Sequence, residues 1–316
     1  MIGREKHMKY IKGFTFAPFC ERGVLAKESS YQSLKVMQET TGCNTVIFAP
    51  VGWQETAHSE TIDFESDATC GDEELCSMIS FAKELGLIVG IKPTVNCKDG
   101  TWRAHVNFFD EDVPCEPKWC NWFASYTKFQ LHYAKLAQKM GCDIFIAGCE
   151  MVMSERREEE WRRLISDIRQ EYKGLVSYNT DKYQEHNVKW WDCVDVISSS
   201  GYYPIDDWKG QLERIEKVVK KFDKPFFFAE MGCMSVEGSS SVPNDWYMTG
   251  EADQTDQAEW FQAMFEEVEK NTWVGGLAIW SWSDTLFENQ EAQADKGYEI
   301  YGKKALEVVR EHFSRL

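Results

Sequence analysis

Short apolar runs alternate along the chain with longer stretches in which apolar residues recur every three or four positions. The short runs are typical of strands buried on both faces, and the longer stretches are typical of amphipathic helices. This alternation favours an α/β protein with a parallel sheet. The eight predicted strands are Tyr10–Phe16, Thr45–Pro50, Ile88–Pro93, Ile144–Gly148, Leu175–Tyr178, Val196–Gly201, Phe226–Ala229 and Leu277–Trp280.

Helical periodicity fills the intervals between these strands and follows the last one. Eight strands are the number that a closed (β/α)₈ barrel requires, and 316 residues suit such a barrel with insertions. With no internal repeat or linker, we predict that residues 1–316 form one (β/α)₈ TIM-barrel catalytic domain. The predicted helices are Ser30–Thr41, Asp72–Leu85, Trp119–Met140, Ser154–Tyr172, Asp181–Trp191 (the weakest pattern), Asp207–Phe222, Thr255–Lys270 and Lys303–Phe313.

The connections on the two sides of the predicted barrel differ in length. Connections from strand to helix are long and rich in aromatic and polar residues, as in Val51–Gly71, Asn96–Lys118 and Met231–Gln254. Connections from helix to strand are short, as in Gly42–Asn44 and Gly86–Leu87. Barrel enzymes carry their active sites on the loops that follow the strands. We therefore expect the functional site at that end.

Two of the apolar runs end in a glutamate. Glu150 closes the fourth predicted strand and Glu230 closes the seventh. An ionisable group at the end of a buried strand is costly unless its surroundings use the charge. Retaining glycosidases place two carboxyl groups about 5 to 5.5 Å apart, one as nucleophile and one as proton donor. The pair is thus a candidate for glycoside cleavage; alternatively, each glutamate caps its strand and faces solvent.

Composition narrows the class of ligand. The formal net charge of −17 disfavours nucleic acid and anionic membrane surfaces as partners. No apolar run has the length of a membrane span. Thirteen tryptophans are more than packing usually requires, and sugar rings stack on indole. An oligosaccharide is therefore the partner that the composition favours, while the oligomeric state stays open.

The cysteines predict a reducing compartment. There are eleven, an odd number, without paired spacing, and the spacings Cys70–Cys76 and Cys115–Cys120 match no tight zinc motif. The segment Met1–Met8 is polar and lacks the apolar core of an export signal. We expect a cytoplasmic protein that contains no metal and needs no cofactor.

The chain carries the motifs Tyr10–Phe16, Lys92-Pro93, Gly148-Cys149-Glu150-Met151, Ser200–Pro204, Phe228–Gly232 and Trp280-Ser281-Trp282. Together these motifs resemble glycoside hydrolase family 113, and the resemblance extends over most of the chain, from about Tyr10 to Val309. That family belongs to a large clan of retaining (β/α)₈ barrels and contains β-1,4-mannanases. The resemblance implies hydrolysis of β-1,4-mannosidic bonds in manno-oligosaccharides or mannan by double displacement, with Glu150 as acid/base and Glu230 as nucleophile.

An acid/base of this kind needs a raised pKa, which we expect from the neighbouring carboxylate and apolar surroundings of Glu150. Tyr202 or Tyr203 is a candidate donor to the nucleophile, with packing beside Pro204 as the alternative. Trp280 is a candidate sugar platform, or else a core tryptophan. The predicted substrate-binding residues are Lys92, Asn96, Trp102, Arg103, Tyr202, Tyr203 and Trp280.

Two positions depart from the family pattern. Many clan members carry asparagine before the acid/base, where this chain has Cys149, and histidine often follows Lys-Pro, where this chain has Thr94. Both departures leave the sugar preference open. The alternatives are the same machinery acting on a gluco-, xylo- or galacto-configured β-glycoside, or a sugar-binding barrel without turnover.

Overall fold

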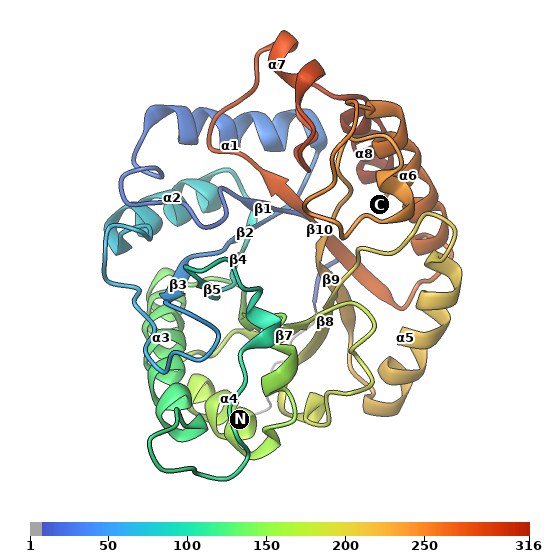
Figure 1. Cartoon of the computed structure of the whole chain (residues 1–316). Coiled ribbons are helices and arrows are strands. Elements are labelled where there is room, and N and C mark those ends of the chain that lie inside the picture. The colour runs from blue at the N-terminus through green and yellow to red at the C-terminus, as the bar shows by residue number, and fades with distance from the viewer. Residues whose placement is uncertain (1–7) are drawn as a thin grey trace, which may run out of the picture.

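The computed structural model describes residues 8–316, so residues 1–7 of the predicted domain and of the polar N-terminal segment lie outside it (Figure 1). Eight parallel strands close into a barrel in the order β1-β10-β9-β8-β7-β6-β4-β2, which confirms the predicted fold. All eight predicted strands are present. Their bounds are β1 Ile11–Phe16, β2 Thr45–Phe48, β4 Ile88–Ile91, β6 Ile144–Cys149, β7 Leu175–Thr180, β8 Val196–Ser200, β9 Phe226–Met231 and β10 Val274–Trp282.

Helices surround the barrel and bury their apolar faces against the strands (Figure 1). Short 3₁₀ turns lie in the connections between them: η1 Arg103–His105, η2 Val152–Ser154, η3 Trp191–Cys193 and η4 Ser239–Ser241. None of the helices within residues 8–316 combines the length and apolar character needed to cross a membrane. The helices are α1 Glu28–Thr41, α2 Asp72–Glu84, α3 Trp119–Met140, α4 Glu158–Glu171, α5 Trp208–Phe222, α6 Gln254–Val268, α7 Asn289–Ala294 and α8 Lys304–Arg315.

The barrel interior is filled by side chains that alternate along the strands, as in other barrels of this type. Outward-facing residues of the same strands join a much larger cluster beneath the helices, so the barrel wall is apolar on both sides. The interior cluster comprises Ile11, Ile47, Ile144, Ile146, Val196, Phe227, Ala229 and Ala278.

A second, two-stranded parallel sheet extends the barrel rim where the sequence predicted only loops. β3 (Val51–Gln54) follows β2 after Pro50, and β5 (Thr94–Cys97) follows β4 after Pro93. A proline has no N–H for the ladder, so each strand is interrupted before pairing resumes beyond it. Arg103, in the loop after β5, donates from Nε to the Val95 carbonyl at 3.0 Å, so this extension helps to hold Trp102 and Arg103 at Glu150.

The predicted helix Asp181–Trp191 is wrong, since these residues form turns that lead into the 3₁₀ turn η3 (Trp191–Cys193). The segment instead buries Glu185 completely. Its carboxylate accepts hydrogen bonds from Ser199 and Tyr203 and pairs with Arg214 at 2.6 Å. These contacts outweigh the weak helical propensity of the segment.

Glu185 therefore anchors this connection, and its removal should be costly. In Glu185→Ala we expect the free energy of unfolding to fall by about 3 to 5 kcal/mol, because the Arg214 charge loses its buried partner. Denaturant unfolding measures the change. Glu39→Ala is the matched control: Glu39 pairs with Lys35 on the exposed face of α1, and its loss should cost less than about 0.5 kcal/mol. Equal effects in both variants would contradict the anchoring role.

Candidate active site

The end of β6 breaks the strand alternation so that two consecutive residues reach the barrel mouth. Ile144 and Ile146 face inward, and the register against β7 then shifts before Cys149. Gly148 makes the shift possible: its φ is +101°, and a Cβ there would lie 2.0 Å from the Tyr126 hydroxyl. Glu150 follows with φ +53°, a left-handed conformation that is uncommon outside glycine.

Backbone contacts with β7 hold this strained turn in place. The Glu150 N–H donates to the Asn179 carbonyl at 2.8 Å, and the Met151 N–H donates to the Tyr178 hydroxyl at 3.0 Å. That hydroxyl in turn donates to the buried carboxyl of Glu155 at 2.8 Å. A residue keeps such an uncommon backbone conformation only where several surrounding contacts fix it.

A register shift also redirects Glu230 in β9. Phe226 and Phe228 pack outward under the helices while Phe227 and Ala229 face the interior, so strict alternation would turn Glu230 outward. The pairing with β8 slips just before Glu230. A β-bulge re-aims the side chain that follows it. Glu230 thus enters the barrel mouth, where it is 2% exposed.

Three donors surround the Glu230 carboxylate. The Lys92 ammonium lies 2.7 Å from Oε2, the Cys149 thiol donates to the same oxygen at 3.4 Å, and the Tyr202 hydroxyl donates to Oε1 at 2.7 Å. Burial has the largest single effect and lowers the pKa of Lys92, but Glu230 together with the neighbouring Cys149 and Glu150 raises it by more, so the pKa of that ammonium is raised overall. Lys92 therefore stays charged in the core, as an ion-pair partner of Glu230.

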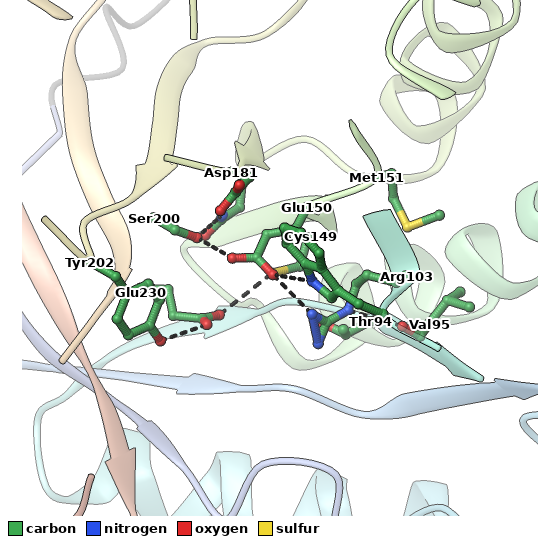
Figure 2. Close-up of polar contacts among 12 residues, drawn as sticks. Thr94, Val95, Arg103, Cys149, Glu150, Met151, Asp181, Ser200, Tyr202 and Glu230 are labelled. Carbon is green, nitrogen blue, oxygen red and sulfur yellow. Dashed lines mark hydrogen bonds and ion pairs between the residues drawn. The ribbon is translucent and has the colours of Figure 1, made fainter. Parts of the chain in front are cut away.

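The Glu150 carboxylate has its own set of donors (Figure 2). Arg103 Nη1 and Trp102 Nε1 donate to Oε2 at 3.0 and 3.1 Å, and the Ser200 hydroxyl donates to Oε1 at 2.8 Å. Burial raises the pKa of Glu150, but Arg103, Ser200 and further partners together lower it below its usual range. The expected raised pKa of Glu150 is therefore wrong, because the sequence did not place Arg103 on this carboxylate.

The two carboxylates face one another across the barrel mouth (Figure 2), and one oxygen of each lies within 4.8 Å of the other. This is the proximity of a nucleophile and a proton donor that act on one glycosidic bond with retention. Cys149 completes a group of three possible metal donors. Lys92 and Arg103 already occupy the carboxylates, and burial raises the pKa of the Cys149 thiol well above its usual value. The donor set thus disfavours a cation.

The two candidate tyrosines have different positions. Tyr202 donates to Glu230, whereas the Tyr203 hydroxyl donates to Glu185 at 2.8 Å in the core network beneath α5. The prediction that Tyr203 binds substrate is therefore wrong, because its side chain is fully buried on the other side of the strand end. Tyr202 is the tyrosine that contacts Glu230.

The remaining predicted binding residues lie at different depths. Trp280 is near the carboxylates, with its ring 5.5 Å from the Lys92 ammonium. Asn96 is on β5, and none of the polar contacts found within residues 8–316 joins it to either glutamate. Thr94 is buried, and its hydroxyl donates to the Lys92 carbonyl at 3.0 Å. It therefore contacts the backbone of Lys92 beneath the site.

Sequence reasoning missed several groups around the site. Ser200 donates to Glu150, and its position at the end of β8 was the signal that could have found it. Phe19 and Trp246 come from the loops after β1 and β9, and both rings pack on Trp280, at 5.2 and 6.0 Å between centroids. No sequence pattern marks these two aromatic residues, because the folding of their loops alone brings them to the site.

A separate hollow of about 680 Å³ lies on the outside, lined by Arg22, Tyr31, Asp72 and His132 among others. Charged groups in this hollow pair with neighbouring side chains: His132 contacts Asp72 at 2.8 Å, and Arg22 contacts Asp67 at 3.2 Å. The hollow contains neither of the two buried carboxylates, so the barrel mouth is the better candidate for catalysis.

Comparison with known proteins gives consistent matches. A family model described as Glycoside Hydrolase Family 113 matches residues 14–303. A solved β-1,4-mannanase of this family is 50% identical over 98% of this chain and 100% of its own, with a TM-score of 0.96. The family 113 β-mannanase of Alicyclobacillus acidocaldarius, solved in complex with ManMIm, is 38% identical over 97% of this chain and 98% of its own, with a TM-score of 0.94.

A more distant structure shares the fold alone. The β-D-glucuronidase of Dictyoglomus thermophilum is 17% identical, with a TM-score of 0.66; the match covers 99% of this chain and 51% of the glucuronidase. No curated protein matches this chain significantly.

The contrast between the two tyrosines gives a matched pair of variants. Tyr202→Phe removes a donor to Glu230, and we expect kcat to fall on the order of 10²-fold with little loss of stability. Tyr203→Phe removes a donor to Glu185, and we expect near-normal kcat with about 1 to 2 kcal/mol lost from the free energy of unfolding. Steady-state kinetics and denaturant unfolding on both variants measure this. The reverse pattern would show that Tyr202 does not act on the reacting carboxylate.

Proposed function

The chain belongs to glycoside hydrolase family 113, and we propose that it hydrolyses β-1,4-mannosidic bonds of manno-oligosaccharides or mannan with retention. Support for the substrate comes from relatives at 50% and 38% identity that are β-1,4-mannanases. Support for the chemistry comes from one observation above all: two buried carboxylates with oxygens within 4.8 Å of each other, each paired with its own cation.

In the first step Glu230 attacks the anomeric carbon from below the ring. Lys92 and Tyr202 hold its two oxygens in a fixed orientation, so little reorganisation is needed on attack. The glycosidic C–O bond breaks, its electron pair goes to the leaving oxygen, and Glu150 supplies the proton. The product is a glycosyl ester of Glu230.

In the second step Glu150 acts as a base. Arg103, Trp102 and Ser200 stabilise its ionised form, which is the form that the second step requires. Glu150 takes a proton from water, the water oxygen attacks the anomeric carbon, and the Glu230 ester bond breaks. The two inversions give net retention.

Trp280 and the aromatic residues that pack on it supply an apolar wall beside the carboxylates. The Trp102 indole is 40% exposed and extends from Glu150 toward solvent, where it can contact the leaving-group sugar. The cytoplasmic location remains a prediction; there, imported manno-oligosaccharides would be the available substrates.

Product analysis on a panel of manno-, cello-, xylo- and galacto-oligosaccharides tests the substrate. We expect cleavage of the manno series alone, with the β-anomer formed first by NMR, and no turnover in Glu230→Gln. Cleavage of a different series would show that the substrate contains another sugar, and the proposed mechanism would stay the same. A Glu230→Gln protein with more than about a tenth of the wild-type rate would exclude Glu230 as nucleophile, since such residues contribute several orders of magnitude.

Substrates whose leaving groups differ in their need for a proton test whether Glu150 is the acid. In Glu150→Gln we expect manno-oligosaccharide cleavage to fall far more than the first step on an aryl mannoside with an acidic phenol, which departs without a proton. Pre-steady-state release of the phenol measures that step. Equal losses on both substrates would contradict the assignment of Glu150 as the acid.

A further inference from the structure

A buried carboxyl that takes no part in the steps above lies behind the turn that carries Glu150. Glu155 directly follows η2 and is 4% exposed. Its Oε1 accepts hydrogen bonds from the hydroxyl of Thr180 at 2.6 Å and from that of Tyr178 at 2.8 Å. Within residues 8–316 Glu155 has no ion-pair partner, and its Oε2 has no hydrogen-bond partner. Glu155 therefore acts through the two hydrogen bonds on one oxygen.

The two donors to Glu155 are on the outer face of β7. Tyr178 and Thr180 are two positions apart, so their side chains point to the same face of the strand. Tyr178 belongs to the large apolar cluster beneath the helices. Asn179, between them, points to the opposite face and donates from Nδ2 to the Ser200 hydroxyl at 3.0 Å. Glu155 thus lies behind the barrel wall, where it can affect the reacting carboxylates only through other residues.

The Tyr178 hydroxyl connects Glu155 with the turn of Glu150. Its oxygen accepts the Met151 N–H at 3.0 Å, and its proton is donated to Glu155. The Tyr178 ring is fully buried and packs on Trp161, at 4.8 Å between centroids, so the direction of the O–H bond is its main remaining freedom. The proton and the lone pairs of a hydroxyl point in different directions. An acceptor at Glu155 therefore turns a lone pair of Tyr178 toward Met151.

A neutral carboxyl at Glu155 fits these contacts. The carbonyl oxygen of a neutral acid has two lone pairs and can accept from both hydroxyls, and the proton is then on Oε2. The groups that face Glu155 are Tyr178 and Thr180 from β7, and Asp181 and Glu185 from the loop after β7. Burial raises the pKa of Glu155 to about 8, with smaller contributions from the two acids, although the two hydroxyls lower it. An amide presents the same carbonyl oxygen, so glutamine is a close substitute.

We propose that Glu155 is a positioning residue for Glu150, the acid/base, and acts through the Tyr178 hydroxyl. This inference rests on the proposed function. The hydroxyl fixes the Met151 N–H, and with it the left-handed turn in which Glu150 has φ +53°. The Asn179 carbonyl holds the N–H of Glu150 itself, so without Tyr178 the turn keeps only one of these two contacts. A small rotation of the turn would move the Glu150 carboxyl away from the leaving oxygen.

Two variants of β7 form a matched pair. Tyr178→Phe and Thr180→Val each remove one hydroxyl that donates to Glu155, but only the first also frees the Met151 N–H. In Tyr178→Phe we expect manno-oligosaccharide cleavage to fall about tenfold to a hundredfold, because Glu150 is misplaced. Phenol release from an activated aryl mannoside needs no proton from Glu150 and should change far less. Thr180→Val should keep both rates near the wild-type values.

The ratio of these two rates is the decisive quantity, because it does not depend on how much of the protein is folded. If the role of Tyr178 is only structural, both rates fall together and the ratio is that of the wild type. An unchanged ratio in Tyr178→Phe would therefore overturn the proposal. An equal change of the ratio in Thr180→Val would overturn it as well, since that variant leaves the contact with Met151 in place.

Substitutions of Glu155 itself separate its hydrogen bonds from its charge. Glu155→Gln keeps an acceptor for Tyr178, and we expect the wild-type ratio of the two rates. Glu155→Leu has a similar volume without an acceptor, and the ratio should fall as it does in Tyr178→Phe. A Glu155→Gln protein with the same defect as Glu155→Leu would contradict the role of the carbonyl oxygen. If Glu155→Leu does not fold, the comparison of Tyr178→Phe with Glu155→Gln decides.

Hydrogen exchange at the Met151 amide tests the inference without any substrate. In protein labelled with ¹⁵N-methionine, the Met151 signal is identified by its loss in Met151→Leu. We expect its exchange to be about tenfold faster or more in Tyr178→Phe and Glu155→Leu, and unchanged in Thr180→Val and Glu155→Gln. This result would support the positioning role even if the panel identified another sugar. Equal exchange in all of these proteins would overturn it even if mannosides are cleaved.

Discussion

Two negative charges within 4.8 Å, in a part of the barrel almost closed to water, are the constraint on which the site depends. Buried carboxylates are unstable unless each finds a cation and further donors. Lys92 meets this need for Glu230, and Arg103 meets it for Glu150. Both cations come from the region around β4 and β5, so the rim extension after Pro93 is part of the electrostatics as well as of the fold.

The backbone geometry also depends on bringing the two carboxylates together. An undisturbed barrel strand presents every second side chain to the interior, which would not place Cys149, Glu150 and Glu230 together. Register shifts at the ends of β6 and β9 redirect these residues, and the left-handed conformation of Glu150 is held by contacts with β7. The strain lies where the chemistry needs a fixed geometry, and the regular barrel beneath it provides the support.

The sequence predicted the barrel well because buried parallel strands are continuous apolar runs, and all eight were recognised. It also predicted Glu150, Glu230 and Lys92 at strand ends, since charge at the end of such a run is conspicuous. It did not predict that Tyr202 rather than Tyr203 meets Glu230, because adjacent residues after a strand end differ only in direction. The lowered pKa of Glu150, the segment around Glu185 and the place of Glu155 depend on contacts between segments distant along the chain, which local patterns do not encode.

The proposed mechanism requires that Glu230 forms a covalent bond with the sugar. Its most direct test is mass spectrometry of the protein after reaction with a mannoside that carries fluorine at C2 and a good leaving group, which slows the second step more than the first. We expect one sugar unit per chain, on the peptide that contains Glu230. A label on Glu150, or steady turnover with inversion and no labelled protein, would contradict it.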